Sequence, residues 1–372
     1  MSITQHAIAI LGPTASGKSD VAIQLAQKYN GEVISCDSRQ VYRHMNIGTG
    51  KVECDLSEIS NFQYPISNKN ISKRTNVKNE TSSDSPSPQM RGRCPKGGWG
   101  DDKTCSAHDF ICEGVKHHLL DIVHPKDDYN VAHFQKDARL ALTHITKNHK
   151  LPILCGGTGL WAQALIEDFD IPEVPPNPKL REELTVLSLE ELQERLRELA
   201  PEKLKTIDTN NSRRLIRAIE VADHAKRKTR NVKRQSKERI CVEPTTLPTH
   251  WALIVLSPPR EILVANIEKR LDERLREGML EEVKMLHEKH DVSWERLENF
   301  GLEYRWTSRY LRKFISYEVM RENLLLDSRH YAKRQLTWLK RWEKQGRTLH
   351  WASTKKEGLR VAEQLLKERL DS

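Results

Sequence analysis

A glycine-containing segment near the N-terminus has the pattern G-x-x-x-x-G-K-[ST], and its residues read Gly12-Pro13-Thr14-Ala15-Ser16-Gly17-Lys18-Ser19. Glycines let the backbone curl until several N–H groups face one anion, and Lys18 supplies a positive charge. The Ser19 hydroxyl is the type of oxygen that ligates Mg²⁺ beside a bound phosphate. The segment therefore predicts a phosphate-binding loop, with Mg²⁺ as the cofactor and Ser19 as its ligand.

The residues after the next apolar run carry a carboxylate that could act on a bound substrate. This run leads into Ser35-Cys36-Asp37-Ser38-Arg39-Gln40-Val41-Tyr42, and Gly48-Thr49-Gly50-Lys51 follows. A phosphate-binding loop alone leaves kinases, nucleotide hydrolases and transferases with a diphosphate substrate open. The residues after the second apolar run add the carboxylate of Asp37 to this region.

Several further blocks follow in a fixed order along the chain. They are His117-His118-Leu119-Leu120-Asp121, Tyr129-Asn130-Val131-Ala132-His133-Phe134, Gly156-Gly157-Thr158-Gly159-Leu160-Trp161, Arg213-Arg214-Leu215-Ile216-Arg217-Ala218-Ile219-Glu220, Gly301-Leu302-Glu303-Tyr304-Arg305 and Ala332-Lys333-Arg334-Gln335-Leu336-Thr337-Trp338. Together with the two N-terminal motifs, these blocks resemble the tRNA dimethylallyltransferase family. The resemblance covers nearly the whole chain except residues 53–113 and the far C-terminus. Departures from the family pattern include Arg39 in place of a common Met, Ser19 in place of a common Thr, and Asn266 in place of a frequent Arg.

The elements that must position these residues follow from hydrophobic periodicity. Apolar runs predict strands over residues 7–11, 32–35, 151–155 and 251–256, and apolar spacing predicts a helix over 18–29. Strands that alternate with helices are typical of an α/β fold with a parallel sheet, whose ligands bind at the carboxyl ends of the strands. We therefore expect an α/β fold with a P-loop NTPase-like parallel sheet core.

The amino-acid composition and pattern change in two places along the chain, and these changes predict the domain organisation. Residues 53–113 are rich in Ser, Asn, Lys and Pro, and we interpret them as a disordered surface insert. Residues 171–239 have leucines at steps of three and four among alternating charges, which predicts a helical insert. The family resemblance implies that this insert binds tRNA. The catalytic core then comprises residues 1–170 and 240–372. The basic run over 227–239 fits either a solvated loop or a contact with the tRNA backbone.

Composition narrows the class of partner and the cellular compartment. The formal net charge of +9 favours a polyanionic partner, because lysines and arginines gain free energy by displacing counterions from phosphates. No apolar run approaches the roughly 20 residues that a membrane span requires. The N-terminal apolar run leads directly into a glycine loop, unlike a signal peptide. We expect a cytoplasmic, monomeric protein without a membrane segment.

The seven cysteines include no C-x-x-C pair, which predicts a reduced compartment and neither a disulfide framework nor a zinc ribbon. Cys94, Cys105, His108 and Cys112 do not have the spacing of a common zinc site, so we do not assign a metal to them. Cys36 and Cys155 are expected to be small buried hydrophobic residues.

The family resemblance implies roles for individual residues. It makes Asp37 the general base that takes a proton from the exocyclic amine of adenine as that nitrogen attacks the allylic carbon. It makes Lys18, Mg²⁺ on Ser19 and Arg270 the groups that stabilise the departing diphosphate. His117 and His118 are expected to be packed, hydrogen-bonded histidines outside the site.

The resemblance also places a larger set of residues against tRNA, and it places Thr14 near the prenyl donor or the tRNA. This set comprises Asp37, Ser38, Arg39, Gln40, Thr158, Arg181, Arg213, Arg214, Leu215, Ile216, Arg217, Asn299, Phe300, Gly301, Leu302, Glu303, Tyr304, Arg305, Trp306, Lys333, Arg334, Gln335, Leu336, Thr337, Trp338, Leu339 and Lys340. The target base must leave its stack to reach such a site.

We therefore expect transfer of a dimethylallyl group from dimethylallyl diphosphate to N6 of the adenosine at tRNA position 37, next to the anticodon. An adenine-nucleotide prenyltransferase and a small-molecule kinase with a phosphate-binding loop are the alternatives. A nucleic-acid-binding module without catalysis is disfavoured, because it needs neither a complete phosphate-binding loop nor an adjacent carboxylate.

Overall fold

The computed structural model describes most of the chain and divides it into two compact units. The described residues are 6–53, 55, 110–172, 174–231, 248 and 250–370. One unit comprises residues 1–169 and 245–372, and the other comprises residues 170–244. The sequence predicted the boundaries of the helical insert at 171 and 239. Most of the predicted disordered insert over 53–113 lies outside the described residues.

The larger unit is built on a seven-stranded sheet in the order β3-β4-β2-β5-β1-β6-β7. Its strands are β1 His6–Leu11, β2 Gly31–Cys36, β3 Phe110–Cys112, β4 Val115–His118, β5 Leu151–Gly156, β6 His250–Leu256 and β7 His350–Ala352. All neighbouring strands are parallel except β3, which is antiparallel to β4. Strands β1 and β5 are buried along their whole length, as the continuous apolar runs of a parallel sheet predict. The predicted α/β fold is confirmed.

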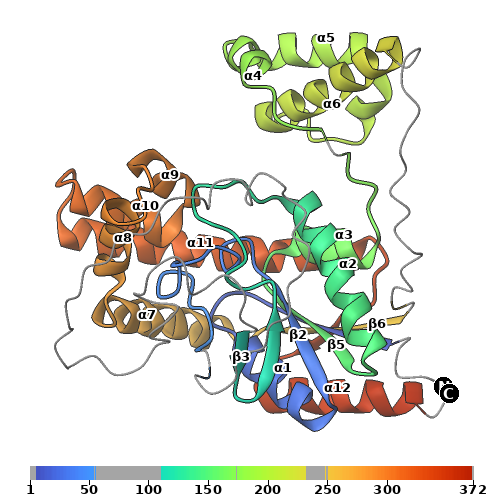
Figure 1. Cartoon of the computed structure of the whole chain (residues 1–372), viewed down its shortest axis with the longest axis vertical. Helices are drawn as coiled ribbons and strands as arrows, with labels where there is room; N and C mark the ends of the chain where they lie inside the picture. The colour runs from blue at the N-terminus through green and yellow to red at the C-terminus, as the bar shows by residue number, and fades with distance from the viewer. Residues whose placement is uncertain are drawn as a thin grey trace, which may run out of the picture. The chain divides into compact units, whose positions relative to one another are not determined.

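Helices cover both faces of this sheet (Figure 1). The helices of the larger unit are α1 Lys18–Lys28, α2 Val131–Lys147, α3 Gly159–Ile166, α7 Arg260–Arg276, α8 Met279–Glu288, α9 Trp294–Phe300, α10 Leu302–Leu311, α11 Tyr317–Lys344 and α12 Lys355–Leu370. Helices α1 and α12 bury their apolar side chains against one face, and α2 and α3 do so against the other. Within the described ranges, no helix has the length and apolar character that a membrane span requires.

The smaller unit is helical and has its own core. It contains α4 Pro178–Thr185, α5 Leu189–Leu199, a 3₁₀ helix at Pro201–Lys205 and α6 Ser212–Asn231. Asn177 caps α4, and Ser188 forms a capping box with Glu191 at the start of α5, so the sequence itself sets where these helices begin. Leu192, Leu196 and other leucines pack together between the helices.

The last residues of the predicted disordered insert are ordered, which corrects its C-terminal boundary. Ile111 and Cys112 are buried in β3, and the N–H of Asp55 donates to the carbonyl oxygen of Ile111 at 2.6 Å. Burial of apolar side chains at the edge of the sheet is favourable because it removes them from water. Strand β3 therefore forms although the sequence before it is polar. Cys94, Cys105 and His108 lie outside the described residues. Cys36 and Cys155 are buried, as predicted.

Candidate active site

The phosphate-binding loop joins β1 to α1 and depends on glycine at two positions. Gly12 has φ +152°, and a Cβ there would overlap with the carbonyl oxygen of Leu256 in the neighbouring strand β6. Gly17 has φ +84° and precedes the first residue of α1, where the free N–H groups of the helix face outward. The loop therefore presents a helix N-terminus at the carboxyl edge of the sheet, the position expected for an anion site.

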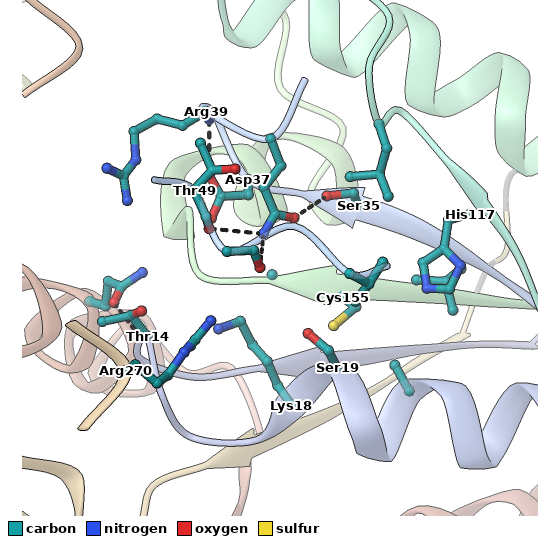
Figure 2. Close-up of a pocket in the computed structure, with 18 of the residues that line it drawn as sticks. Thr14, Lys18, Ser19, Ser35, Asp37, Arg39, Thr49, His117, Cys155 and Arg270 are labelled. Carbon is teal, nitrogen blue, oxygen red and sulfur yellow. Dashed lines mark hydrogen bonds between the residues drawn. The ribbon is translucent and has the colours of Figure 1, made fainter. Parts of the chain in front are cut away.

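Lys18, Ser19, Asp37 and Arg270 line one pocket that encloses about 670 Å³, part of it open to solvent. Figure 2 shows the Asp37 loop on one side of this pocket, with Lys18 and Arg270 close together on the other. The Lys18 ammonium donates to the carbonyl oxygen of Pro13 at 3.2 Å. The site thus brings together all the residues that the sequence predicted as catalytic.

Burial raises the cost of the positive charges in this pocket. It lowers the pKa of Lys18, and the neighbouring Arg270 and Arg274 lower it further, whereas Asp37 raises it. Burial also lowers the pKa of Arg270 to about 10, and Arg274 adds to that shift. Cations that are desolvated and crowded together gain from a bound anion, so the pocket is suited to a diphosphate.

Asp37 lies directly after β2, and its carboxylate has a fixed orientation. Asp37 Oδ1 accepts a hydrogen bond from the N–H of Arg39 at 2.9 Å, and Thr158 Oγ1 accepts one from the N–H of Ser38 at 3.2 Å. The N–H of Thr158 in turn donates to the carbonyl oxygen of Cys36 at 3.2 Å. These bonds tie the loop after β2 to the loop after β5, and the carboxylate is thereby held toward the pocket.

Gln40 and the Gly48–Lys51 motif shape the wall of the pocket. Gln40 accepts a hydrogen bond from the Ser35 hydroxyl at 3.2 Å and donates to the carbonyl oxygens of Thr49 and Gly50 at 3.4 and 3.3 Å. Lys51 is buried and donates to the carbonyl oxygen of Tyr42 at 2.9 Å and to Asp121. Lys51 therefore holds the loop from inside.

A buried carboxylate on α8 supports the same loop from behind. Glu282 accepts hydrogen bonds from the N–H groups of Asn46, Ile47 and Gly48 at 2.8, 2.6 and 3.0 Å, and from the Tyr304 hydroxyl at 2.9 Å. Burial raises the pKa of Glu282, although these four donors oppose the shift. Sequence reasoning missed Glu282, because nothing in the α8 sequence indicates which distant N–H groups it meets.

Glu303 and Arg274 form a second cluster beside the pocket. Glu303 accepts from Arg39 at 2.5 Å and from Arg274 at 2.7 Å, and all three side chains are largely buried. Arg274 was not among the predicted site residues. Its position four residues after Arg270 on the same helix is the signal that could have identified it.

Helix α11 has one face toward the pocket and one toward solvent. Tyr331 and Gln335 line the pocket, and Gln335 accepts from the N–H of Thr14 at 2.9 Å and donates to the carbonyl oxygen of Gly157 at 2.9 Å. On the outer face, four predicted tRNA-binding side chains are exposed, namely Lys333, Arg334, Thr337 and Lys340. Trp338 packs against Gly159, where a Cβ would overlap with its indole ring.

Five residues predicted to contact tRNA have side chains that are buried in this structure. They are Leu215, Glu303, Tyr304, Gln335 and Leu339. Leu215 and Leu339 pack into hydrophobic cores, and the three polar side chains bond within the protein. Leu336, Ile216, Phe300 and Leu302 are partly buried against apolar clusters. Each sequence block includes residues from both the buried and the exposed face of its helix, so the block alone does not tell which residues are buried.

The predicted basic residues of the helical unit have internal partners as well as exposed surface. Glu220 is buried and accepts hydrogen bonds from Arg181 at 2.7 and 2.8 Å, from Arg217 at 3.1 Å and from the N–H of Asn177 at 2.9 Å. Burial alone would raise the pKa of Glu220, but these donors outweigh it and hold the pKa below its usual value. Arg213 and Arg214 are exposed on α6.

The two adjacent histidines are packed and hydrogen-bonded, as predicted. His118 Nε2 lies 2.6 Å from Glu32 Oε2. His117 Nδ1 lies 2.9 Å from the carbonyl oxygen of Val115, and burial lowers the pKa of His117 to about 4. His117 also lines the pocket, although the sequence analysis placed it outside the site.

Comparisons with known proteins agree on one family. A family model described as IPP transferase matches residues 106–342, and one described as isopentenyl transferase matches residues 5–72. The chain is 37% identical to tRNA dimethylallyltransferase 1 of Syntrophus aciditrophicus, over 93% of each chain. It is 36% identical to tRNA dimethylallyltransferase 2 of Treponema denticola, over 94% of this chain and 97% of the relative.

Solved structures show the same likeness. The tRNA isopentenylpyrophosphate transferase of Bacillus halodurans matches with a TM-score of 0.58 and 26% identity, covering 99% of this chain and 97% of that one. A eukaryotic dimethylallyltransferase acting on tRNA shares the fold, with a TM-score of 0.62 and 24% identity over 94% of this chain and 74% of that one.

Proposed function

This chain belongs to the tRNA dimethylallyltransferase family, and we propose that it transfers the dimethylallyl group of dimethylallyl diphosphate to N6 of the adenosine at tRNA position 37, next to the anticodon. Membership of this family supports transfer of a dimethylallyl group to a tRNA adenosine as the activity. The nucleotide prenyltransferase and kinase alternatives are not favoured. The observation that carries the proposal is that Asp37 and Lys18 line the same pocket. A base and a diphosphate cradle therefore share one reaction space.

Asp37 is the proposed general base. In the reaction, the N6 nitrogen forms a bond to the allylic carbon, the bond from that carbon to the diphosphate oxygen breaks, and the proton of the amine passes to the Asp37 carboxylate. An exocyclic amine is too weak an acid to ionise first, so a carboxylate within hydrogen-bond reach must accept the proton as the new bond forms. The hydrogen bond from the N–H of Arg39 orients the carboxylate for this step.

Lys18, Arg270 and the N–H groups at the start of α1 are the proposed partners of the leaving diphosphate. Negative charge on the leaving oxygen grows as the carbon–oxygen bond breaks, so cations fixed in a desolvated pocket stabilise the transition state more than the ground state. Burial is the main cause of the lowered pKa values of Lys18 and Arg270, and the neighbouring positive charges add to it, so a bound diphosphate would stabilise both cations.

The residues of the loop fit a magnesium ion carried with the diphosphate. Ser19 lines the pocket and offers an oxygen ligand. In the described part of the chain, no group of three His, Cys, Asp or Glu side chains could hold a metal ion by itself. Mg²⁺ typically binds through few protein ligands together with substrate phosphates, so Ser19 would hold it and the ion would neutralise diphosphate charge.

The tRNA is the proposed partner of the exposed basic side chains on α11 and α6. Lys333, Arg334 and Lys340 are exposed on α11, which also lines the pocket through Tyr331. Such a surface can follow phosphates while one unstacked base enters the reaction space. We further expect the enzyme to act in the cytoplasm as a monomer.

The test is a transfer assay with an unmodified tRNA that has adenosine at position 37. With Mg²⁺ and dimethylallyl diphosphate, nuclease digestion and mass spectrometry should identify N6-dimethylallyladenosine from that position. AMP offered in place of tRNA should give no product. Product from AMP but none from tRNA would move the assignment to nucleotide prenyltransferases, and phosphate transfer from ATP without prenylation would favour a kinase.

A further inference from the structure

Glu303 is a buried carboxylate shared between two arginines from different elements. Its Oε2 accepts from Arg39 at 2.5 Å, and its Oε1 accepts from Arg274 at 2.7 Å. Arg39 belongs to the loop that carries Asp37, and Arg274 belongs to α7, the helix of Arg270. Glu303, at the start of α10, therefore connects the loop of the proposed base with the helix of a proposed diphosphate ligand.

The side chains of Arg270 and Arg274, both on α7, converge on the backbone at Gly50, in the opposite wall of the pocket. A Cβ on Gly50 would overlap with the Nη2 atoms of both Arg270 and Arg274, so the two guanidinium groups reach the same patch of backbone. Arg39, Arg270 and Arg274 also line a second cavity together with Glu303, with about 360 Å³ of space, part of it open to solvent. The described residues lining this cavity thus include three arginines and one carboxylate.

Like charges held this close repel one another, and burial strengthens the repulsion. Glu303 offsets it, because each of its two oxygens takes an N–H of a different guanidinium. Burial alone would raise the pKa of Glu303, but Arg39 and Arg274 hold it below its usual value, so the carboxylate is ionised at neutral pH. Arg274 is thereby kept in place beside Arg270.

We propose that Glu303 is a positioning residue of the diphosphate site, which holds Arg274 against Gly50 and so keeps Arg270 directed at the phosphate-binding loop. The proposal rests on the proposed function, because it assigns Arg270 to the leaving diphosphate. It also gives Glu303 an internal role in place of the tRNA contact that the sequence implied. Through Arg39, the same carboxylate fixes the loop that carries Asp37.

Removal of the Glu303 charge should separate anion binding from catalysis. In Glu303→Gln, Arg39 and Arg274 lose their counter-charge, so the pocket becomes more positive and attracts pyrophosphate at least as well as before. Rate acceleration, by contrast, requires donors aimed at the leaving oxygen, and a misplacement of about 1 Å can cost up to roughly 100-fold. We expect kcat to fall by about 10-fold or more, while pyrophosphate inhibits at an equal or lower concentration.

A second substitution tests the repulsion directly. Arg274→Met removes the cation that Glu303 balances, so Glu303→Gln/Arg274→Met should recover at least half of the lost kcat on a logarithmic scale. The matched control is Glu298→Gln, because Glu298 also bonds two arginines, Arg309 at 3.0 Å and Arg312 at 2.8 Å, but lines neither cavity. That variant should retain wild-type kcat.

Three results would overturn the proposal. They are an unchanged kcat in Glu303→Gln, weaker inhibition by pyrophosphate, or no recovery in the double variant. A rise in KM for tRNA with kcat unchanged would instead indicate that Glu303 contacts tRNA. Direct binding of pyrophosphate, measured by calorimetry on the full chain, needs no knowledge of the acceptor. It therefore separates failure of this proposal from failure of the proposed reaction.

Discussion

Gln335 and Thr14 are 321 positions apart in the chain, yet the side-chain oxygen of Gln335 accepts the N–H of Thr14 at 2.9 Å. The amide nitrogen of Gln335 donates to the carbonyl oxygen of Gly157 at 2.9 Å. One side chain on α11 thus connects the phosphate-binding loop with the loop after β5. The backbone of both loops depends on it for part of its hydrogen bonding.

We therefore predict that Gln335→Leu impairs the donor site and leaves tRNA affinity within about twofold. A fully buried backbone group that loses its partner costs about 1–3 kcal/mol; the two groups here are only partly buried, so the free energy of unfolding should fall by about 2–4 kcal/mol rather than by the full sum. The KM for dimethylallyl diphosphate should rise about 10-fold, which corresponds to 1.4 kcal/mol. Urea denaturation and steady-state kinetics measure both effects. Gln364→Leu, at an exposed position of α12, is the control and should change stability by less than about 0.5 kcal/mol. A selective loss of tRNA affinity in Gln335→Leu would contradict this interpretation.

The second prediction concerns the proposed base. Asp37→Asn keeps the shape of the side chain and an oxygen that can accept from the N–H of Arg39, but it cannot take a proton. General base catalysis contributes about 10²–10⁴-fold, so kcat should fall by at least about 100-fold. The Kd for tRNA, measured by filter binding, should stay within a few-fold, because the base acts on the barrier more than on ground-state binding. Turnover near the wild-type rate would remove Asp37 from the mechanism.

The third prediction tests the exposed face of α11. Each lysine that contacts a phosphate contributes roughly 0.7–0.9 to the slope of log affinity against log salt. Lys333→Ala/Lys340→Ala should therefore weaken tRNA binding and reduce this slope by about 1.5. Inhibition by pyrophosphate should change little. Lys356→Ala/Lys367→Ala removes two exposed lysines from α12 and serves as the charge-matched control. Equal slope changes in both double variants would mean that only net charge matters.

The fourth prediction is a pH dependence of stability that arises from His117. Its pKa is near 6.5 in an unfolded chain and about 4 in the folded protein, because burial disfavours the charged ring. Below pH 6.5 the unfolded state therefore binds the proton first, and stability is lost progressively until the pH reaches about 4. The full difference corresponds to about 3 kcal/mol, from 1.36 kcal/mol for each pKa unit.

The measurement is urea denaturation of the wild type and His117→Asn at pH 7, 5.5 and 4. The variant has no ring to titrate at this position, while His118 and the carboxylates titrate in both proteins. Between pH 7 and pH 4, the wild type should lose about 3 kcal/mol more than the variant. Parallel losses in the two proteins would show that His117 does not carry this dependence.

Local sequence determined the elements and the chemistry near the N-terminus. Strands β1 and β5 follow from short apolar runs, and the phosphate-binding loop follows from glycine spacing, because only neighbouring residues set these features. Asp37 lies two residues after the strand predicted over 32–35, so its place at the carboxyl edge of the sheet was also predictable. The helical character of the segment after residue 170 likewise follows from local hydrophobic periodicity.

Tertiary structure alone decided which members of each sequence block face the pocket or solvent and which face the core. Glu303 and Gln335 belong to blocks that the resemblance placed against tRNA, but the structure pairs Glu303 with Arg39 and Arg274, and Gln335 with Thr14 and Gly157. These partners lie 29 to 321 positions away in the chain. A buried polar group must find a partner to offset its desolvation, and only the folded chain determines which distant groups come within reach.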